Sequence, residues 1–335
     1  MVNLHSATAQ SAYIDLLRLL RDDAVADIRG SIDRRERNGV VYVYEKYRIG
    51  SKDVRRYLGI EDDEMRARLE RHEALRAEKD TRRKERTRLV RLLRAEGYLS
   101  TGRTSGSLLA AMARAGAFRL GAVLVGTAAF RLYEGELGIR LGADQSAMTQ
   151  DIDIASFSQI SVALGDTVDP SLADVFTELK FDPVPALDGG AWRWKQAGTE
   201  TLVEFLAPYS SDRGQQRIEA LGIEARSMRF MEFLLRDPIH AVALYRDGVL
   251  VRIPSPERYA IHKLIVANRR QGDNTLKARK DLMQAELLIE VLAQDRPGEL
   301  AFAYEEATGT GPRWREHIDG SIRQLPGTAD RLAAL

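Results

Sequence analysis

The stretch that decides the fold is TQDIDIASF, residues 149–157. Successive side chains of a β-strand point to opposite faces of a sheet, so we expect Ile152 and Ile154 to enter a core while Asp151 and Asp153 share the other face. Two adjacent carboxylates repel each other, and burial would force a proton onto one of them unless a cation lies between them. Hard oxygen ligands suit Mg²⁺ or Mn²⁺. The pattern therefore predicts a metal site, and the alternative is an acidic strand edge that faces water.

Two further apolar stretches carry polar residues that could join this site. In LVGT (Leu124–Thr127), a buried strand ends in Gly126 and Thr127, where the exposed N–H groups of a following helix and the Thr127 hydroxyl could hold phosphate oxygens. In VEFL (Val203–Leu206), Glu204 is a lone carboxylate among apolar residues, which is seldom kept without a partner. Glu204 could be a third metal ligand or accept a proton from an attacking hydroxyl. The alternatives are a turn kept for packing and an edge-strand acid.

The composition describes an ordinary globular protein and excludes several kinds of site. The chain has 335 residues, 44% of them apolar and 30% charged, which suggests about two domains. The lack of Cys excludes disulfides, thiolate catalysis and Cys-ligated metal sites, and only five His make a His-rich metal site unexpected. No apolar run approaches the ~20 residues that cross a bilayer, and the first residues lack a secretory-signal pattern. We therefore expect a cytoplasmic protein with no membrane partner.

The net charge of +1 is the sum of two unlike parts. Residues 1–104 hold 24 Lys and Arg against 18 Asp and Glu, whereas residues 105–335 hold 26 against 31. A basic arm joined to an acidic body is typical of a protein that binds a polyanion with one part and cations with the other. Unselected surface charge is the alternative.

The arm pattern predicts a helix over Ser11–Arg37, a β-hairpin over Gly39–Gly59 and a long helix over Glu61–Glu96. Aromatic rings among basic side chains suit stacking on nucleic-acid bases, and a dense basic run suits a phosphate backbone. A small sheet with half-buried rings and a solvated helix are the alternatives. The tyrosines are Tyr42, Tyr44, Tyr47 and Tyr57, the basic residues of the hairpin are Lys46, Arg48, Lys52, Arg55 and Arg56, and those near the helix end include Arg82, Arg83, Lys84, Arg86 and Arg88.

The rest of the chain divides into a mixed core and a helical end. Gly97–Gly106 has the composition of a linker, strands and short helices alternate after it, and the pattern is helical from Ser255 onward. We expect an α+β fold with three parts: a basic helical and β-hairpin arm (1–104), a mixed-sheet core (105–254) and a C-terminal helical domain (255–335).

Gly126-Thr127, Asp151-Ile152-Asp153 and Glu204, in this order, resemble the DNA polymerase β nucleotidyltransferase superfamily. The core also resembles a bacterial family that reads LVGTAAF…TQDIDIA, and more distantly the AbiEii abortive-infection toxins. The resemblance covers about residues 107–293. It implies a polymerase-β-like core, an NTP substrate, Mg²⁺ or Mn²⁺ bound by the three acids, and transfer of an NMP.

The same resemblance implies roles for residues around the acids. Arg131 stands where those toxins carry a phosphate-binding Lys, and Lys263 corresponds to a Lys that contacts the triphosphate. Lys280 and Asp281 resemble a Lys-Asp element on the following helix. Arg193, between two tryptophans, is expected to contact the nucleotide or the acceptor. The 23 residues between Thr127 and Asp151 exceed the usual gap, so we expect an insertion over Glu134–Met148 that loops out.

The acceptor is less narrowly defined by the sequence. The basic arm favours RNA, and the toxin-like resemblance suggests a tRNA 3′ end and an antitoxin partner. The alternatives are a protein-modifying nucleotidyltransferase and a non-catalytic nucleic-acid-binding module.

Overall fold

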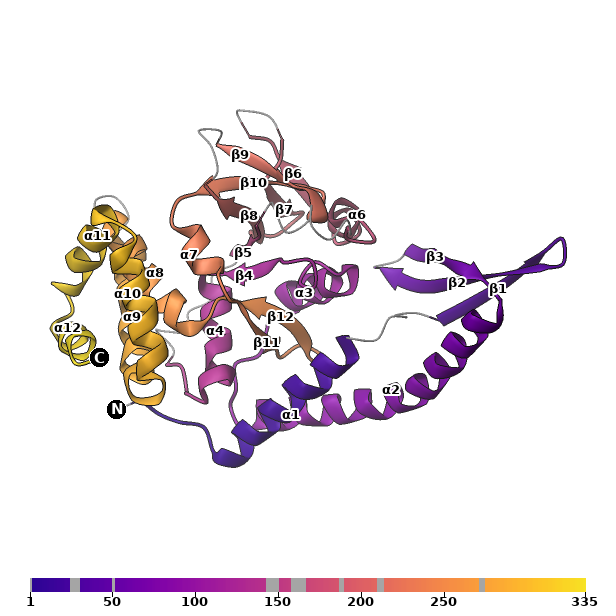
Figure 1. Cartoon of the computed structure of the whole chain (residues 1–335), viewed down its shortest axis with the longest axis horizontal. Coiled ribbons are helices and arrows are strands. Elements are labelled where there is room, and N and C mark those ends of the chain that lie inside the picture. The colour runs from indigo at the N-terminus through magenta and orange to yellow at the C-terminus, as the bar shows by residue number, and fades with distance from the viewer. Residues whose placement is uncertain are drawn as a thin grey trace.

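A mixed central sheet with helices on both sides forms the body of the protein (Figure 1). The computed structural model describes residues 2–24, 31–49, 52–142, 151–157, 167–186, 190–209, 214–270 and 275–335. Within them the sheet has the order β4-β5-β8-β10-β9, and β7 pairs with both β8 and β6. Its strands are β4 (Val123–Val125), β5 (Asp151–Ala155), β6 (Phe181–Val184), β7 (Arg193–Gln196), β8 (Leu202–Pro208), β9 (Gln215–Ile218) and β10 (Ile223–Met228). The expected α+β class is confirmed.

Strand β8 is the centre of this sheet, and one of its edges is shared by two partners. Strand β5 runs parallel to it on one edge, with Asp153 opposite Glu204. On the other edge, the first half of β8 pairs with antiparallel β7 and the second half with parallel β10. The apolar residues Val203 and Phe205 alternate with Glu204, and Phe205 packs on Phe176 with ring centroids 5.7 Å apart. One face of β8 is therefore core, and the other carries Glu204.

Helices surround the sheet and complete the core. Ser255 caps α8 by accepting a hydrogen bond from the Arg258 N–H, as its Ser-Pro-Glu start predicts. Among the described residues, no helix is long and apolar enough to cross a membrane. The elements are α3 (Arg103–Ala115), α4 (Gly126–Leu137), α6 (Leu172–Glu178), α7 (Met231–Leu235), α8 (Pro256–Arg269), α9 (Thr275–Asp295), α10 (Pro297–Gly309), α11 (Pro312–Ile322) and α12 (Pro326–Ala333), with a short 3₁₀ turn at Glu219–Leu221 and a hairpin of β11 (Ile239–Ala243) and β12 (Val249–Ile253).

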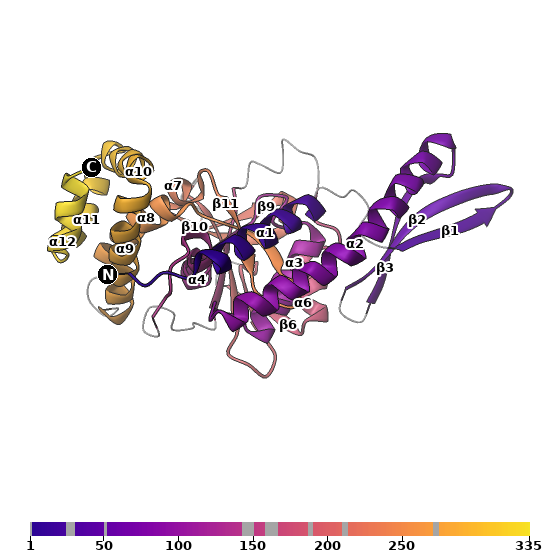
Figure 2. The same ribbon diagram turned by 90° about the horizontal axis from the view of Figure 1, so that it is seen from below.

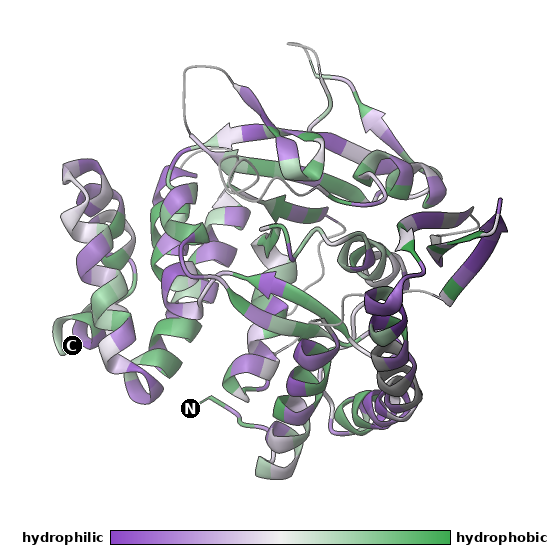
Figure 3. Ribbon diagram, turned by 45° about the vertical axis from the view of Figure 1, so that its right-hand side comes forward, coloured by the Kyte–Doolittle hydropathy of each residue, from purple (hydrophilic) through white to green (hydrophobic). Residues whose placement is uncertain are grey.

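The N-terminal arm consists of two helices and a three-stranded antiparallel sheet. Its elements are α1 (Ala7–Ala24), β1 (Ser31–Arg37), β2 (Val40–Ile49), β3 (Lys52–Ile60) and α2 (Asp63–Ala95). In Figures 1 and 2 this sheet and the C-terminal helices lie at opposite ends of the molecule. The small sheet is largely hydrophilic, whereas strands of the body are more apolar (Figure 3).

The expected helix over Ser11–Arg37 is wrong for its last seven residues, which form β1. Strand β1 pairs with β2 through a two-residue turn at Asn38-Gly39, where both residues have positive φ (55° and 75°). Asn-Gly is the strongest short signal for such a hairpin. The segment before this turn, Ser31–Arg37, is mostly charged and has no alternating apolar pattern that would predict a strand. It forms a strand because its backbone pairs with β2, which requires little apolar surface.

The basic run on α2 is partly structural, which corrects its interpretation as a phosphate-binding surface. Arg86 is buried and forms ion pairs with Asp23 of α1 and with Asp247 of the β11–β12 turn. Arg82 also pairs with Asp23, at 3.2 Å. Leu93 of α2 is buried beside them, in a cluster that α1 and β11 share. Arg82 and Arg86 therefore join α2 to α1, and Arg86 also attaches the arm to the body.

The expected insertion over Glu134–Met148 begins too early. Helix α4 continues to Leu137, and Glu134 is buried, where it accepts a hydrogen bond from the Leu99 N–H (2.6 Å) and contacts His5 (3.2 Å). Residues 143–148 of that prediction lie outside the described residues.

Candidate active site

The Gly126-Thr127 turn lies against the first acidic strand. Gly126 opens α4 with φ +65°, a conformation that favours glycine. A Cβ at this position would lie 2.2 Å from Oδ2 of Asp153. A side chain at residue 126 would therefore displace the Asp153 carboxylate, and the glycine allows the turn and the acid to approach closely.

The three predicted acids lie on one face of two adjacent strands. Asp153 is opposite Glu204 in the parallel register of β5 and β8, and Asp151 is two residues earlier on the same face. Ile152 and Ile154 are buried on the other face, as the alternation predicts. Burial, reinforced by Glu204, raises the pKa of Asp153 to about 7. The structure thus places a desolvated carboxylate beside two further acids, an arrangement that attracts cations.

Two arginines border Glu204 at the fork of β8. Arg193 is opposite Glu204 on β7, and Arg226 is opposite Leu206 on β10. Both guanidinium groups lie over the ring of Trp192, at 4.5 and 5.2 Å from its centroid. Burial raises the pKa of Glu204, whereas Arg193 lowers it. Arg226 was not expected from the sequence, because its proximity to Glu204 depends on strand pairing.

A group of cations from three helices lies near the same acids. Lys263 of α8 is buried, and among the cations it lowers the pKa of Asp153 the most. Burial, followed by repulsion from Lys263, lowers the pKa of Lys280 on α9, and Arg131 of α4 contributes to the same shift. Asp281 compensates part of this positive charge, and a bound anion would compensate more of it. The arrangement is suited to a polyphosphate.

Asp281 holds Lys263 in place. Its Oδ1 lies 2.5 Å from the Lys263 Nζ, and its Oδ2 lies 2.6 Å from a guanidinium nitrogen of Arg270. Asp281 is only 2% exposed. The buried carboxylate therefore fixes the positions of the Lys263 ammonium and the Arg270 guanidinium.

Tyr259 links this helix to the glycine turn, a role that the sequence did not indicate. Its hydroxyl donates to the Gly126 carbonyl oxygen at 2.9 Å and also lies 3.1 Å from Oε1 of Gln284. The Lys263 Nζ lies 5.2 Å from the centroid of the Tyr259 ring. One buried side chain thus connects α4, α8 and α9.

The segment that the sequence marks as a linker lines a pocket beside the acids. Residues 99–102 and Ser105 surround this pocket together with Thr127, Arg131 and Asp151. Arg131 also donates a long hydrogen bond to the Ser100 carbonyl oxygen (3.4 Å). The only signal in the sequence is the density of Ser, Thr and Gly in GYLSTGRTSG, which is equally typical of a turn.

The donor set suits a hard cation, although the described residues do not form a ready-made metal site. No group of three or more carboxylate or His side chains within the described ranges is arranged to hold an ion. The side chains available at Asp151, Asp153 and Glu204 offer only oxygen ligands, which match Mg²⁺ or Mn²⁺. The raised pKa of Asp153 fits a group that a cation would return to its charged form.

A family model described as "Nucleotidyltransferase" matches residues 103–309. This chain belongs to that nucleotidyltransferase family. No curated protein and no solved structure matches the chain. The matched range begins at α3 and ends with α10, so it contains the glycine turn, the three acids and all the cations described above. Family membership thus makes the chain a nucleotidyltransferase, an enzyme for which an NTP is the implied substrate.

Proposed function

We propose that this nucleotidyltransferase transfers an NMP from an NTP to an acceptor hydroxyl, most favourably on RNA, with the help of Mg²⁺ or Mn²⁺. The observation that carries the proposal is the juxtaposition of unlike charges around Gly126: carboxylates on β5 and β8, and cations from α4, α8 and α9. The resemblance to the polymerase β superfamily supports the same assignment.

In the proposed reaction, the acceptor oxygen attacks the α-phosphorus, a new O–P bond forms, and the bond to the β-phosphate breaks to release pyrophosphate. Asp151, Asp153 and Glu204 would hold the divalent ions. When bound, such ions neutralise charge on the phosphoryl oxygens. Glu204, whose pKa burial raises, is the candidate base that takes the proton of the attacking hydroxyl.

The cationic groups would bind the triphosphate. The N-terminal turn of α4, with Gly126 and the Thr127 hydroxyl, can accept phosphate oxygens. Arg131, Lys263 and Lys280 would neutralise the β- and γ-phosphates, and Asp281 fixes the Lys263 ammonium through a buried ion pair. Arg193 would contact the nucleotide or the acceptor beside Glu204.

The exposed face of the arm sheet supports RNA as the acceptor. Tyr44 and Tyr57 lie opposite each other in register, with ring centroids 5.4 Å apart, and Tyr42 lies 6.3 Å from Tyr57. Tyr57 is 52% exposed, whereas Val43, on the other face, is buried against α2. Aromatic rings on an open sheet face are suited to stacking on bases. The Tyr47 side chain lies outside the described residues.

Basic groups share this face, although acids compensate part of their charge. Lys46 and Arg55 are opposite each other in register, Lys46 pairs with Asp53 at 3.2 Å, and Arg55 pairs with Asp33 at 3.2 Å. Such exposed pairs are weak, so a phosphate can displace the acid. A toxin-like role with an antitoxin partner rests on the resemblance to AbiEii toxins alone.

The test incubates the protein with each labelled NTP, a divalent ion, and either total tRNA or a protein lysate. We expect label to enter RNA and to disappear in the Asp151→Ala, Asp153→Ala variant. Label in protein instead of RNA would establish the protein-modifying alternative, and no label in any fraction would favour a non-catalytic nucleic-acid-binding module. Transfer that survives the double substitution would refute the assigned acids.

A further inference from the structure

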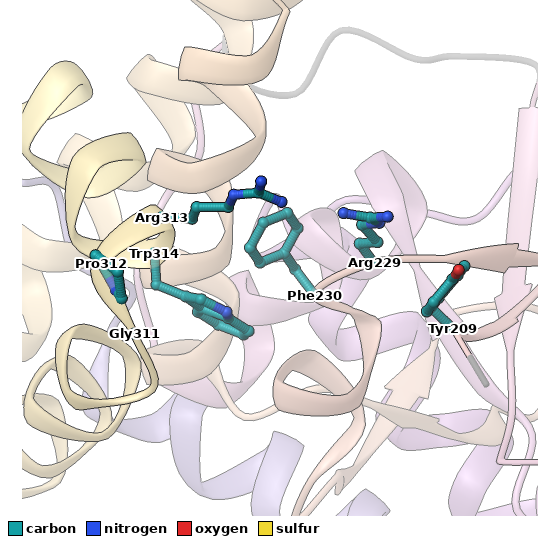
Figure 4. Close-up of a pocket in the computed structure, with 7 residues that line it drawn as sticks. All are labelled: Tyr209, Arg229, Phe230, Gly311, Pro312, Arg313 and Trp314. Carbon is teal, nitrogen blue, oxygen red and sulfur yellow. The ribbon is translucent and has the colours of Figure 1, made fainter. Parts of the chain in front are cut away.

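A pocket between the end of β10 and the start of α11 combines three aromatic rings with two arginines (Figure 4), and a third arginine, Arg269, lies over one of these rings. Tyr209 follows β8, Phe230 follows β10, and Trp314 lies in the first turn of α11. The rings of Phe230 and Trp314 are in edge-to-face contact, with centroids 4.7 Å apart. Phe230 has φ +68°, an unusual conformation for an aromatic residue, which presents its ring to the pocket.

The arginines of this pocket face aromatic rings rather than acids. The guanidinium of Arg229 lies 5.1 Å from the ring centroid of Tyr209, and that of Arg269 lies 5.0 Å from the centroid of Phe230. Arg313 is exposed and points toward the same space in Figure 4. Burial and repulsion from Arg229 lower the pKa of Arg269. Across the described ranges, none of these three arginines forms an ion pair with a carboxylate.

This combination is matched to one kind of ligand. Guanidinium groups bind phosphate oxygens, and open aromatic faces stack on nucleobases. An acidic peptide would contact the cations but offers nothing flat to stack on the rings, whereas a strand of nucleic acid supplies both an anionic backbone and flat bases. The charges and rings together therefore favour a nucleotide.

The pocket is connected to the proposed active site along both β10 and α8. Arg226 is opposite Leu206, which lies two residues after Glu204 on β8. The distance from Arg226 to Arg229 is three residues, or about 10 Å of extended chain. Arg269 lies six residues after Lys263 on α8, about 9 Å along the helix. A span of about 10 Å equals roughly three stacked nucleotides at ~3.4 Å each. Arg226 would thus contact the strand between the acids and the pocket.

We propose that this pocket binds a nucleotide of the acceptor RNA strand, upstream of the end that receives the NMP. The inference rests on the proposed function, because it takes Glu204 to mark the reacting end. Arg313 and Trp314 lie outside the residues that the family model matches. The pocket would therefore add acceptor recognition to the transferase core.

The test measures binding of 5′-labelled single-stranded RNA of mixed sequence by fluorescence anisotropy, over a range of salt concentrations and without NTP or metal. Replacing Arg229→Gln together with Arg313→Gln should weaken binding and reduce the slope of log K against log salt by about 1.4, or ~0.7 for each lost phosphate contact. Tyr209→Leu should weaken binding roughly 5- to 150-fold and leave the slope unchanged. These exposed positions were chosen over Trp314, which also packs on Phe233.

The matched control is Arg323→Gln, which removes one charge from an exposed position just after α11 but outside this pocket. RNA affinities and salt slopes equal to those of the control would overturn the inference, and so would a wild-type protein that binds no single-stranded RNA. Loss of NTP affinity with unchanged RNA affinity would also overturn it, by assigning the pocket to the incoming nucleotide.

The failure of this inference can be distinguished from the failure of the proposed function. If RNA binds through the pocket and no label is transferred, the proposed function fails and the pocket assignment remains. If transfer occurs and the variants bind normally, only the pocket assignment fails.

Discussion

The sheet face around Asp153 and the small sheet of the arm are both rich in charge, yet they use it differently. Around Asp153, the acids and cations come from elements far apart in the sequence; Lys263 and Asp281 are buried, and burial raises the pKa of Asp153. In the arm, Lys46, Arg55 and Arg35 pair with acids of the same three-stranded sheet at exposed or partly exposed positions. Buried charges that converge from distant segments carry a large desolvation cost, whereas exposed pairs carry almost none.

This difference shows that the density of charge is a poor guide to function. The run over residues 82–88 is the most basic part of the chain, but Arg86 serves to join α1, α2 and the β11–β12 turn. Lys263 and Asp281 lie 18 residues apart in the sequence, but the fold pairs them next to the proposed site. Four substitutions test the comparison.

The largest expected effect is on stability at Asp281. Asp281→Asn removes the partner of both Lys263 and Arg270, and breaking a buried pair in this way should lower the free energy of unfolding by about 3 kcal/mol or more. The measurement is denaturant unfolding. The control in the arm is Glu85→Gln, at an exposed pair within α2, which should leave the free energy of unfolding unchanged. Equal effects of the two substitutions would remove the distinction between the regions.

The second prediction concerns Gly126, with Gly222 as a matched control. Both residues have φ near +65°, but an added Cβ meets Asp153 only at Gly126 and meets nothing within 4 Å at Gly222. Each change to Ala should cost about 1 kcal/mol of stability through the left-handed backbone. Only Gly126→Ala displaces the carboxylate, so only it should lower NMP transfer, by at least about a hundredfold. Equal transfer by both variants would show that the close approach to Asp153 does not matter.

The third prediction separates attachment from RNA binding on α2. Arg86→Gln should lower the free energy of unfolding by about 2 kcal/mol, because two charged hydrogen-bond partners lose their donor. Arg83→Gln changes an exposed residue of the same helix and should leave stability unaffected. The salt dependence of RNA binding should be the same for both variants and the wild type if Arg86 only holds the arm. A salt slope of RNA binding that is reduced only in Arg86→Gln would instead show that residues 82–88 contact the phosphate backbone.

The smallest expected effect is a pH dependence of stability at His262. Burial, together with Lys263 and Arg270, lowers the pKa of His262 to about 3. The unfolded chain takes up this proton below about pH 6.5 and the folded chain does not, so stability is lost as the pH falls from about 6.5 toward 3, by up to ~1.4 kcal/mol per unit. Between pH 7 and about 5.5 the wild type should lose about 1 kcal/mol that His262→Gln does not lose. Equal changes in the free energies of unfolding of the wild type and His262→Gln over this range would contradict a buried, neutral His262.

The sequence was sufficient where the signal is local. The alternation of Asp151 and Asp153 with isoleucines predicted both the strand and its two faces, and Ser255 predicted the start of α8. The sequence was insufficient where an element depends on pairing with another strand. Strand β1 has little apolar pattern of its own and is defined by its hydrogen bonds to β2, whose turn signal at Asn38-Gly39 was available.

The same reasoning explains what was found and missed in the site. The predicted acids share one face because the register of β5 and β8 aligns Asp153 with Glu204, which no single strand reveals. The contact of Tyr259 with Gly126 spans 133 residues and has no local pattern. The aromatic and basic pocket combines residues that follow β8, β10 and α10, so its composition became visible only in three dimensions.

The central claim is that the acids of β5 and β8 bind a divalent ion for nucleotidyl transfer, and direct Mn²⁺ binding tests it without relying on activity. Mn²⁺ titration followed by electron paramagnetic resonance should detect binding to the wild type that Asp153→Asn weakens by more than about tenfold. The control, Asp182→Asn, changes an exposed acid of the same sheet on β6 and should bind Mn²⁺ as the wild type does. Equal Mn²⁺ affinity in the wild type and Asp153→Asn would contradict the claim.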